Sequence, residues 1–175
     1  LGELRKRNFA VIAENIKSLK PNGGSLLDVG CSHGWFMETV GNYFEVLGLE
    51  PDKEIFEIAS RRNLPVRMGY FPQALDYCDK FDVIVFNDVI EHIPDIKHTI
   101  LCCYQHLNDG GLLVLNLPNS NGVVYSLSKI FCKFGLSKFF ERLWQKGFPS
   151  PHVHYFNLPN LTSFLERNKF NVKTK

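Results

Sequence analysis

The feature that most constrains this chain is the stretch SLLDVGCSHGWF, residues 25–36, where an apolar run leads directly into a turn with very small side chains. Residues 25–29 have the pattern of a buried strand, Gly30, Ser32 and Gly34 form the turn, and a helix is expected from Trp35. Glycine adopts backbone angles that other residues avoid and lets another molecule approach the main chain. A strand, a glycine-rich turn and a helix N-terminus together open nucleotide-binding α/β folds. The stretch therefore predicts that a ligand meets the backbone at this turn.

Strand and helix signals alternate along the rest of the chain. Further apolar strands are expected at residues 45–50, 65–69, 81–87 and 111–118. Helices are expected at residues 4–19, 35–42, 51–62, 96–107 and 157–168, the last with Asn157 as its N-cap. A sixth strand is expected to begin at residue 170. Such alternation predicts βαβ units around a parallel sheet.

The composition excludes several classes of protein. A length of 175 residues suits one domain with a sizeable core, and 45% hydrophobic with 22% charged residues is ordinary for a soluble protein. The formal net charge of +2, without a block of like charge, gives no reason to expect a nucleic-acid partner. No apolar run reaches the ~18 residues of a transmembrane helix, and the N-terminus does not have the pattern of a signal peptide.

The cysteines favour a reducing compartment. Their number, five, is odd, and no two of them form a C-x-x-C pair. We interpret them as small, buried, reduced side chains of a cytosolic protein. They stand at Cys31, Cys78, Cys102, Cys103 and Cys132.

The turn does not have the dehydrogenase pattern G-x-G-x-x-G. Counted from Gly30, the third position holds Ser32 and the sixth holds Trp35, whose side chain would block close packing. The residues form D-x-G-x-S-x-G instead, from Asp28 to Gly34. This pattern resembles motif I of the class I S-adenosylmethionine-dependent methyltransferases, usually D/E-x-G-x-G-x-G, with Ser32 in place of the middle glycine.

The resemblance extends over most of the chain. FDVIVFNDVIEHIPD looks like the family's fourth strand and following turn, and HLNDGGLLVLNLPN looks like its fifth strand. It is closest to bacterial methyltransferases of the ubiquinone-pathway-like branch and to those near surface-glycan genes. The resemblance implies one methyltransferase domain over residues 1–175, with an α/β, doubly wound, Rossmann-like sheet. Its strand order would be 3-2-1-4-5 plus strand 6, with a helical insert after strand 5.

The resemblance also implies S-adenosylmethionine as the cofactor, with S-adenosylhomocysteine as the product, and a site for it. Glu50 ends the second strand, about 20 residues after the turn, where a carboxylate can accept hydrogen bonds from both ribose hydroxyls. Asp28 would brace the turn near the methionine end, and backbone near Asn87 would hold the amino-acid moiety. The expected cofactor-binding residues are Asp28, Gly30, Cys31, Ser32, Gly34, Glu50, Pro51, Gly69, Tyr70, Phe71, Asn87 and Asp88.

Two aromatic residues follow the third strand, where the family often carries an acid that faces the adenine amine. These residues are Tyr70 and Phe71. Either ring could stack on the adenine, or the pair could pack in the core. Both alternatives stay open from the sequence.

Asp88, Glu91 and His92 share one helix face if the turn after the fourth strand is helical. The trio is similar to one that binds a divalent metal in some O-methyltransferase relatives. Metal-free members also carry the sequence EHI, so no metal ligand is assigned.

Methylation of a hydroxyl requires a base, and histidine titrates close enough to neutrality to serve. We take His92 and His154 as the candidate catalytic residues. The H-x-H sequence of His152 and His154 could instead belong to a structural loop.

Residues 121–148 form an insert that mixes aromatic and basic side chains. In the resembled family, such an insert roofs the substrate site. Peripheral contact with a membrane surface and a protein interface are the rival interpretations. The expected partner is a small-molecule or glycan substrate, including a lipid-linked one, and O-methylation is favoured.

Two other classes of function stay in view. A nucleotide-binding oxidoreductase would share the fold, but it would carry the missing glycine pattern. A methyltransferase-like module could bind the cofactor or a partner without turnover.

The resembled fold also has a seventh strand, between the fifth and the sixth, which this sequence does not reach. We therefore expect an open sheet edge beside the fifth strand. We also expect the natural protein to be longer at its C-terminus.

Overall fold

The computed structural model describes residues 2–120 and 150–173. The described chain divides into two compact units. The first contains residues 2–87 and 101–115, and the second contains residues 88–100, 116–120 and 150–173. The expected insert at residues 121–148 lies outside the described residues. None of the described helices is long and apolar enough to cross a membrane.

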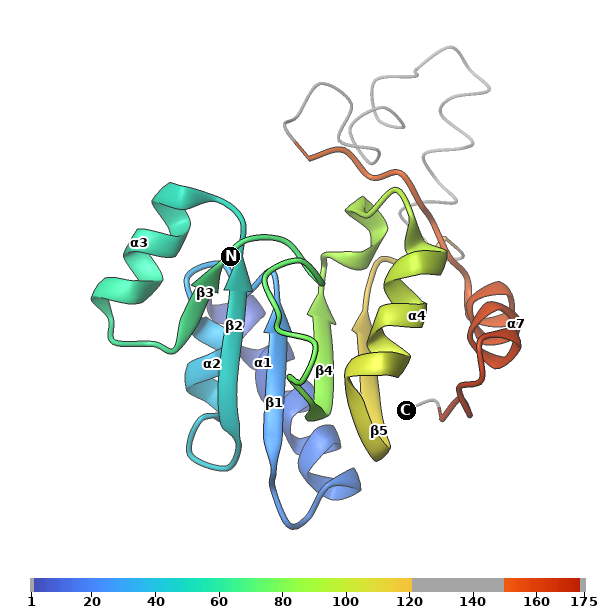
Figure 1. Ribbon diagram of the computed structural model, residues 1–175, viewed down its shortest axis with the longest axis horizontal. Helices are drawn as coiled ribbons and strands as arrows, with labels where there is room; N and C mark the ends of the chain where they lie inside the picture. Colours follow the sequence, from blue (N-terminus) through green and yellow to red (C-terminus); the bar gives the residue numbers. More distant parts are fainter. Residues whose placement is uncertain (1, 121–149, 174–175) are drawn as a thin grey trace. The chain divides into compact units, whose positions relative to one another are not determined.

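The first unit is built on a five-stranded sheet with the order β3-β2-β1-β4-β5 (Figure 1). Its strands are β1 (Ser25–Val29), β2 (Glu45–Glu50), β3 (Val66–Met68), β4 (Phe81–Asn87) and β5 (Leu107–Asn116). β1 pairs in parallel with both β2 and β4, and β2 pairs in parallel with β3. The carboxyl ends of β1, β2 and β4 therefore share one edge of the sheet, where ligands of open α/β sheets bind. The predicted α/β, doubly wound, Rossmann-like sheet with the order 3-2-1-4-5 is confirmed.

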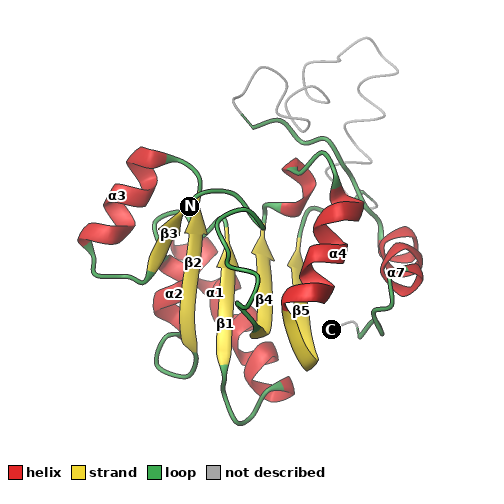
Figure 2. Cartoon of the chain, viewed as in Figure 1, coloured by secondary structure: helices red, strands yellow, loops and turns green. Residues whose placement is uncertain are grey.

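Two helices of the first unit, α1 (Gly2–Leu19) and α2 (Trp35–Val40), pack on the same face of the sheet (Figure 2). Phe9 and Phe36 meet edge to face with ring centroids 5.4 Å apart, and they share a buried cluster with Leu26 and Val83. The packing fixes the direction in which α2 leaves the turn after β1. That direction in turn sets the geometry of the site described below.

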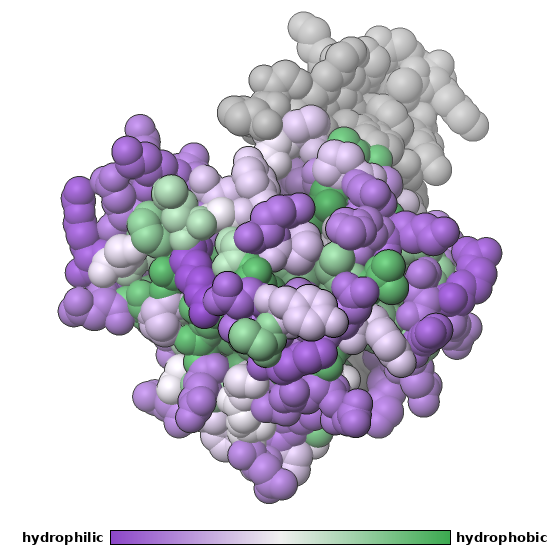
Figure 3. All heavy atoms as spheres, in the orientation of Figure 1, coloured by the Kyte–Doolittle hydropathy of each residue, from purple (hydrophilic) through white to green (hydrophobic). Residues whose placement is uncertain are grey.

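The third helix of the first unit, α3 (Lys53–Arg61), begins at an acidic N-cap. The Asp52 carboxylate accepts hydrogen bonds from the backbone N–H groups of Glu54 and Ile55, at 2.9 and 3.1 Å. Such a cap satisfies backbone donors that the helix itself leaves unpaired. The outer surface of α3 is mainly hydrophilic (Figure 3).

The second unit contains the 3₁₀ turn η1 (Ile90–His92) and helix α7 (Leu158–Arg167). Helix α4 (Ile96–His106) has its first residues in this unit and its remainder in the other. The predicted N-cap of the last helix is confirmed, because the Asn157 side chain accepts from the Asn160 N–H while the Asn160 side chain accepts from the Asn157 N–H. A bridge between Asn119 and Phe156 joins residues 116–120 of this unit to residues 150–173.

The structure differs from the sequence prediction at the fifth and sixth strands. β5 begins at Leu107, four residues before the predicted start at Gly111, and so includes residues with a turn-like composition. The Asn108 amide donates to Oδ1 of Asp82, and the Gly110 carbonyl accepts from the Lys20 ammonium, so side-chain contacts hold this segment. Residues 170–173 form no strand in the described part of the chain. Among the described residues, β5 is the last strand in the order of the sheet, and the expected open edge beside it stays a prediction.

Candidate functional site

The turn after β1 repeats an unusual backbone conformation. Gly30, Ser32 and Gly34 have φ values of 70°, 51° and 79°. The N–H groups of Gly30 and Cys31 both donate to the Leu49 carbonyl, at 2.8 and 2.9 Å, which ties the turn to β2. A left-handed conformation costs a non-glycine residue about 1–2 kcal/mol, so glycine would be the less strained residue at position 32.

Packing within the protein requires a glycine at two positions, Gly34 in the turn and Gly48 in β2. A Cβ atom on Gly34 would lie 2.1 Å from Cδ1 of Leu64, and one on Gly48 would lie 2.7 Å from Sγ of Cys31. The Cys31 side chain is buried beneath the turn, and burial raises the pKa of its thiol, with a smaller contribution from the negative charge of Asp28. If Cys31 contacts the cofactor as predicted, its backbone makes that contact. Packing within the fold therefore requires small side chains here, independently of any ligand that binds at the turn.

Glu50 holds the turn from the end of β2. Its Oε2 accepts a hydrogen bond from the Ser32 N–H at 2.8 Å, and its Oε1 accepts from the Asp52 N–H at 2.9 Å. The side chain is nearly buried, and Pro51 follows it at the rim of the sheet. A carboxylate has about four acceptor positions, so two remain for ligand hydroxyls. The sequence predicted the ribose-binding role of Glu50, but it gave no sign of this clamp.

Asp28 and Asn87 form a buried polar pair at the adjoining ends of β1 and β4. Burial raises the pKa of Asp28 to about 7, the neighbouring Asn87 amide lowers it, and the charge of Glu50 raises it further. Even so, neither Oδ1 nor Nδ2 of Asn87 makes a hydrogen bond of ordinary length and angle to a described residue. Buried amide atoms without partners are costly. The pair is suited to a ligand that offers both donors and acceptors.

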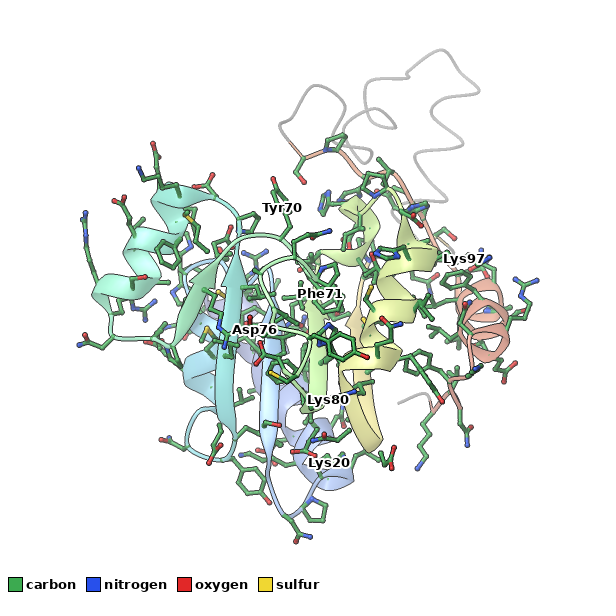
Figure 4. The ribbon with its side chains drawn as sticks, in the orientation of Figure 1. Lys20, Tyr70, Phe71, Asp76, Lys80 and Lys97 are labelled. Atoms are coloured by element: carbon green, nitrogen blue, oxygen red, sulfur yellow. The ribbon has the colours of Figure 1, made fainter. Side chains whose placement is uncertain are left out.

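The two aromatic residues after β3 have different environments (Figure 4). The Phe71 ring is buried and meets Phe86 and His106 edge to face, with ring centroids 5.7 and 6.0 Å apart. Tyr70 is 71% exposed and follows Gly69, whose φ is 139°. Core packing thus accounts for Phe71, whereas Tyr70 presents a ring to solvent.

The second unit contains a separate polar cluster around Glu91. The Glu91 side chain is almost wholly buried, and neither carboxylate oxygen has a hydrogen-bond partner among the described residues. Its backbone carbonyl accepts from the N–H groups of Val153 and His154, at 2.9 and 3.1 Å. Burial raises the pKa of the Glu91 carboxyl.

The histidines around Glu91 come from two chain segments. Donor atoms of Glu91, His92 and His152 all lie within 4.8 Å of one another. His152 Nε2 lies 4.0 Å from Glu91 Oε1, and burial lowers the pKa of His152. Asp88, from the predicted trio, is exposed and does not belong to this group. The H-x-H sequence was the one signal for His152, but it did not reveal Glu91 as its neighbour.

The two predicted catalytic histidines both contact proline carbonyls in this unit. His92 Nδ1 lies 3.0 Å from the Pro151 oxygen, and His154 Nε2 lies 3.2 Å from the Pro94 oxygen. A carbonyl only accepts, so these ring nitrogens carry the proton when the imidazoles are neutral. The lone pairs are then at His92 Nε2 and His154 Nδ1.

Comparison with known proteins gives the family. The family model described as "Methyltransferase domain" matches residues 3–175. The ubiquinone biosynthesis O-methyltransferase of Mus musculus mitochondria is 31% identical over 166 residues, covering 87% of this chain and 43% of the mouse protein. The chain spans about half the length of the curated relatives it matches. These relatives include mammalian and bacterial proteins.

Solved structures that resemble this chain agree with the family match. An amino pentose methyltransferase from Micromonospora echinaspora, determined with S-adenosylmethionine bound, is 26% identical with a TM-score of 0.57, covering 67% of this chain and 55% of that one. A methyltransferase from Archaeoglobus fulgidus at 17% identity has a TM-score of 0.65, covering 93% and 69%, and shows the same fold. The expected cofactor, S-adenosylmethionine, is thereby confirmed. The chain belongs to the methyltransferase domain family and has the fold of the class I S-adenosylmethionine-dependent methyltransferases.

Proposed function

We propose that this chain transfers a methyl group from S-adenosylmethionine to an oxygen nucleophile on a small-molecule acceptor. The observation that carries the proposal is the buried Asn87 amide, unpartnered beside Asp28 and next to a turn that Glu50 holds. These residues lie at the sheet edge where α/β folds bind ligands. The O-methyltransferase name of the mouse relative supports oxygen as the acceptor atom.

Each residue has a proposed role in holding the cofactor. The remaining acceptor positions of Glu50 face the two ribose hydroxyls, and Asp28 with Asn87 takes the ammonium and carboxylate of the methionine end. Backbone at Gly30, Ser32 and Asp88 approaches the ligand. The bound cofactor supplies an activated methyl group on a sulfonium, so the protein mainly aligns the acceptor and excludes water. Alignment alone can contribute roughly 7–11 kcal/mol to lowering the barrier.

The remaining predicted contacts are retained with adjusted roles. Pro51 and Gly69 shape the rim next to Glu50 and Tyr70, and the exposed Tyr70 ring stacks on the adenine. Gly34 and Cys31 support the turn from below, and Phe71 closes the core behind it. A hydroxyl acceptor gives its proton to His92 Nε2 or to His154 Nδ1.

The acceptor class, the domain and the cellular setting belong to the same proposal. The acceptor is a hydroxylated small molecule, with a glycan or a lipid-linked intermediate as the alternative form, and the 1–175 segment acts as one methyltransferase domain. A cytoplasmic setting is supported by the free state of the described cysteines, Cys31, Cys78, Cys102 and Cys103. The expected burial holds for three of them and is wrong for Cys78, which is exposed.

The test is turnover with labelled S-adenosylmethionine and matched acceptors. Catechol-type, sugar hydroxyl and sugar amine acceptors are offered to the same protein, and transferred methyl is counted. Methyl transfer to hydroxyl acceptors, lost in Asn87→Ala and kept in the surface variant Asn63→Ala, supports the proposal. Transfer only to amines would replace oxygen with nitrogen as the acceptor atom. Binding of the cofactor without any turnover would favour the non-catalytic module.

A further inference from the structure

We propose that Arg67 is a positioning residue for the cofactor. Through Asp79 it holds residues 69–80, the loop between β3 and β4, in the shape that keeps the Tyr70 ring ready to stack on the adenine. The inference rests on the proposed function, in which Tyr70 makes that stack. Arg67 and the whole loop lie in the first unit, so all the contacts used below are within one compact part of the chain.

The first observation is that the loop begins beside the proposed ribose site. The Gly69 N–H donates to the backbone carbonyl of Glu50 at 3.1 Å, and Tyr70 follows directly. The carboxylate of the same Glu50 is the proposed acceptor for the ribose hydroxyls. Because the adenine is bonded to that ribose, the Tyr70 ring is within reach of the base.

The second observation is that the Tyr70 ring depends on its loop. The residue is 71% exposed, so the core does not hold the ring in place. Its backbone carbonyl accepts from the Ala74 N–H at 2.9 Å, and the next residue, Phe71, is buried. The ring therefore keeps its position only while residues 69–80 keep their shape.

The third observation is an ion pair that joins β3 to the end of the loop. The Arg67 guanidinium donates to Oδ2 of Asp79. The same oxygen accepts from the Asp76 N–H at 2.9 Å, and the Asp79 N–H donates to the Asp76 carbonyl at 2.9 Å. The Asp76 N–H and the Arg67 side chain hold the pKa of Asp79 below its usual value, so this carboxylate is ionised at neutral pH.

The end of the loop also contacts helix α4. His106 Nδ1 donates to the Asp79 carbonyl oxygen at 2.8 Å, and the Lys80 ammonium donates to the Gln105 carbonyl. From Tyr70 the loop runs past Asp76 to Lys80, at the start of β4 (Figure 4). It is thus held by β2 at its first residue and by β3 and α4 at its last two. Arg67 supplies the side-chain contact from β3.

The position of the ion pair indicates a role in binding more than in folding. The side chains of Arg67 and Asp79 are 41% and 20% exposed. Ion pairs that solvent reaches contribute little to the stability of a fold. A loop that is already ordered in its bound shape, however, raises affinity because less conformational entropy is lost on binding. Removal of Arg67 should therefore weaken cofactor binding while the chain still folds.

The test is calorimetry with S-adenosylhomocysteine on the full chain. Tyr70→Ala should weaken binding roughly 5–150-fold, the range for loss of a base stacked on an aromatic ring. Arg67→Ala should weaken it about 2–10-fold, the range for ordering one side chain. In the Tyr70→Ala background, Arg67→Ala should have no further effect, because Arg67 acts through the ring.

Two further variants show whether the ion pair is the cause. Arg67→Lys should recover most of the affinity, because one guanidinium nitrogen makes the contact with Asp79 and an ammonium can replace it. The matched control Arg61→Ala removes an exposed arginine that pairs with Glu57 on α3, and it should bind as the unmodified protein does. If Arg67→Ala does not fold by circular dichroism, Asp79→Asn takes its place. That change removes the charge and keeps an oxygen for the Asp76 N–H.

Different results would overturn the inference and the proposed function. Equal losses from Arg67→Ala with and without the Tyr70 ring would mean that Arg67 acts on the fold and not through Tyr70. Unchanged affinity in Arg67→Ala, with a loss in Tyr70→Ala, would contradict the role of Arg67 and leave the proposed function standing. Unchanged affinity in Tyr70→Ala would remove the stack itself. No binding of S-adenosylhomocysteine to the unmodified protein would overturn the proposed function, and this inference with it.

Discussion

Ser32 shows how a single residue can depart from a sequence pattern without losing the conformation. It occupies the position of the middle glycine of the motif. Its φ of 51° is a positive value that glycine adopts without strain and that other residues avoid. Its N–H donates to Glu50, and its hydroxyl lies 3.1 Å from Nδ1 of His33. The pattern therefore predicted the turn correctly, but the contacts that hold a serine there involve residues the pattern does not include.

Ser32→Gly should stabilise the fold by up to about 1 kcal/mol, because the strain of the left-handed conformation is relieved. Cofactor affinity should change little, since the backbone N–H is retained. Urea unfolding measures the stability. The matched control Ser60→Gly, within helix α3, should have the opposite sign and destabilise by about 0.5 kcal/mol. Equal destabilisation by both changes would mean that Ser32 is not strained.

The protonation of Asp28 makes the stability of the fold depend on pH. Burial and the neighbouring Glu50 charge raise its pKa from 3.8 to about 7, so the folded state holds a proton that the unfolded chain has released. Between these two values the folded state binds more protons, and stability falls as pH rises through this window. The ionised form above pH 7 is the one suited to an ammonium.

Asp28→Asn should therefore make the fold more stable at pH 8 while weakening cofactor binding. Each pKa unit corresponds to about 1.4 kcal/mol, so the gain is on the order of a few kcal/mol at most. The gain should vanish near pH 4, where Asp28 is protonated in the folded state. Denaturant unfolding at the two pH values measures it, and a gain that does not depend on pH would contradict a raised pKa.

At the scale of elements, α2 can follow β1 closely because position 34 has no side chain. The sequence indicated the strand, the turn and the helix in the right order, and β2 and β4 were predicted with their observed bounds. It could not indicate that Leu64, thirty positions later, fills the space beside Gly34. The early start of β5 was also missed, since its first residues are held by Asp82 and Lys20 rather than by an apolar pattern.

Gly34→Ala should destabilise the fold by about 1–3 kcal/mol, through overpacking against Leu64 and a φ of 79°. In the Leu64→Ala background the same change should cost less, because the overlapping methyl group is gone. A double-mutant cycle by urea unfolding measures this coupling. Additive effects would show that the backbone conformation alone requires glycine at position 34.

At the scale of the whole molecule, the fold class and strand order were predictable because alternating strand and helix signals leave few topologies. The residues of the first unit that we propose to hold the cofactor lie together as the sequence indicated, because one motif and one acid at a fixed spacing mark them. Their contacts with the cofactor stay a prediction. The Glu91 cluster was only partly predictable, since His152 reaches it from a segment about 60 positions away.

The central claim is that the turn and Glu50 form the cofactor site, and one measurement tests it most directly. Calorimetry is run with S-adenosylhomocysteine on the unmodified protein, on Glu50→Ala and on Glu57→Ala, which removes an exposed carboxylate from α3. Glu50→Ala should weaken binding by about 1.5–3 kcal/mol, the scale of hydrogen bonds to charged groups, and Glu57→Ala should bind as the unmodified protein does. Unchanged affinity in Glu50→Ala would contradict the account.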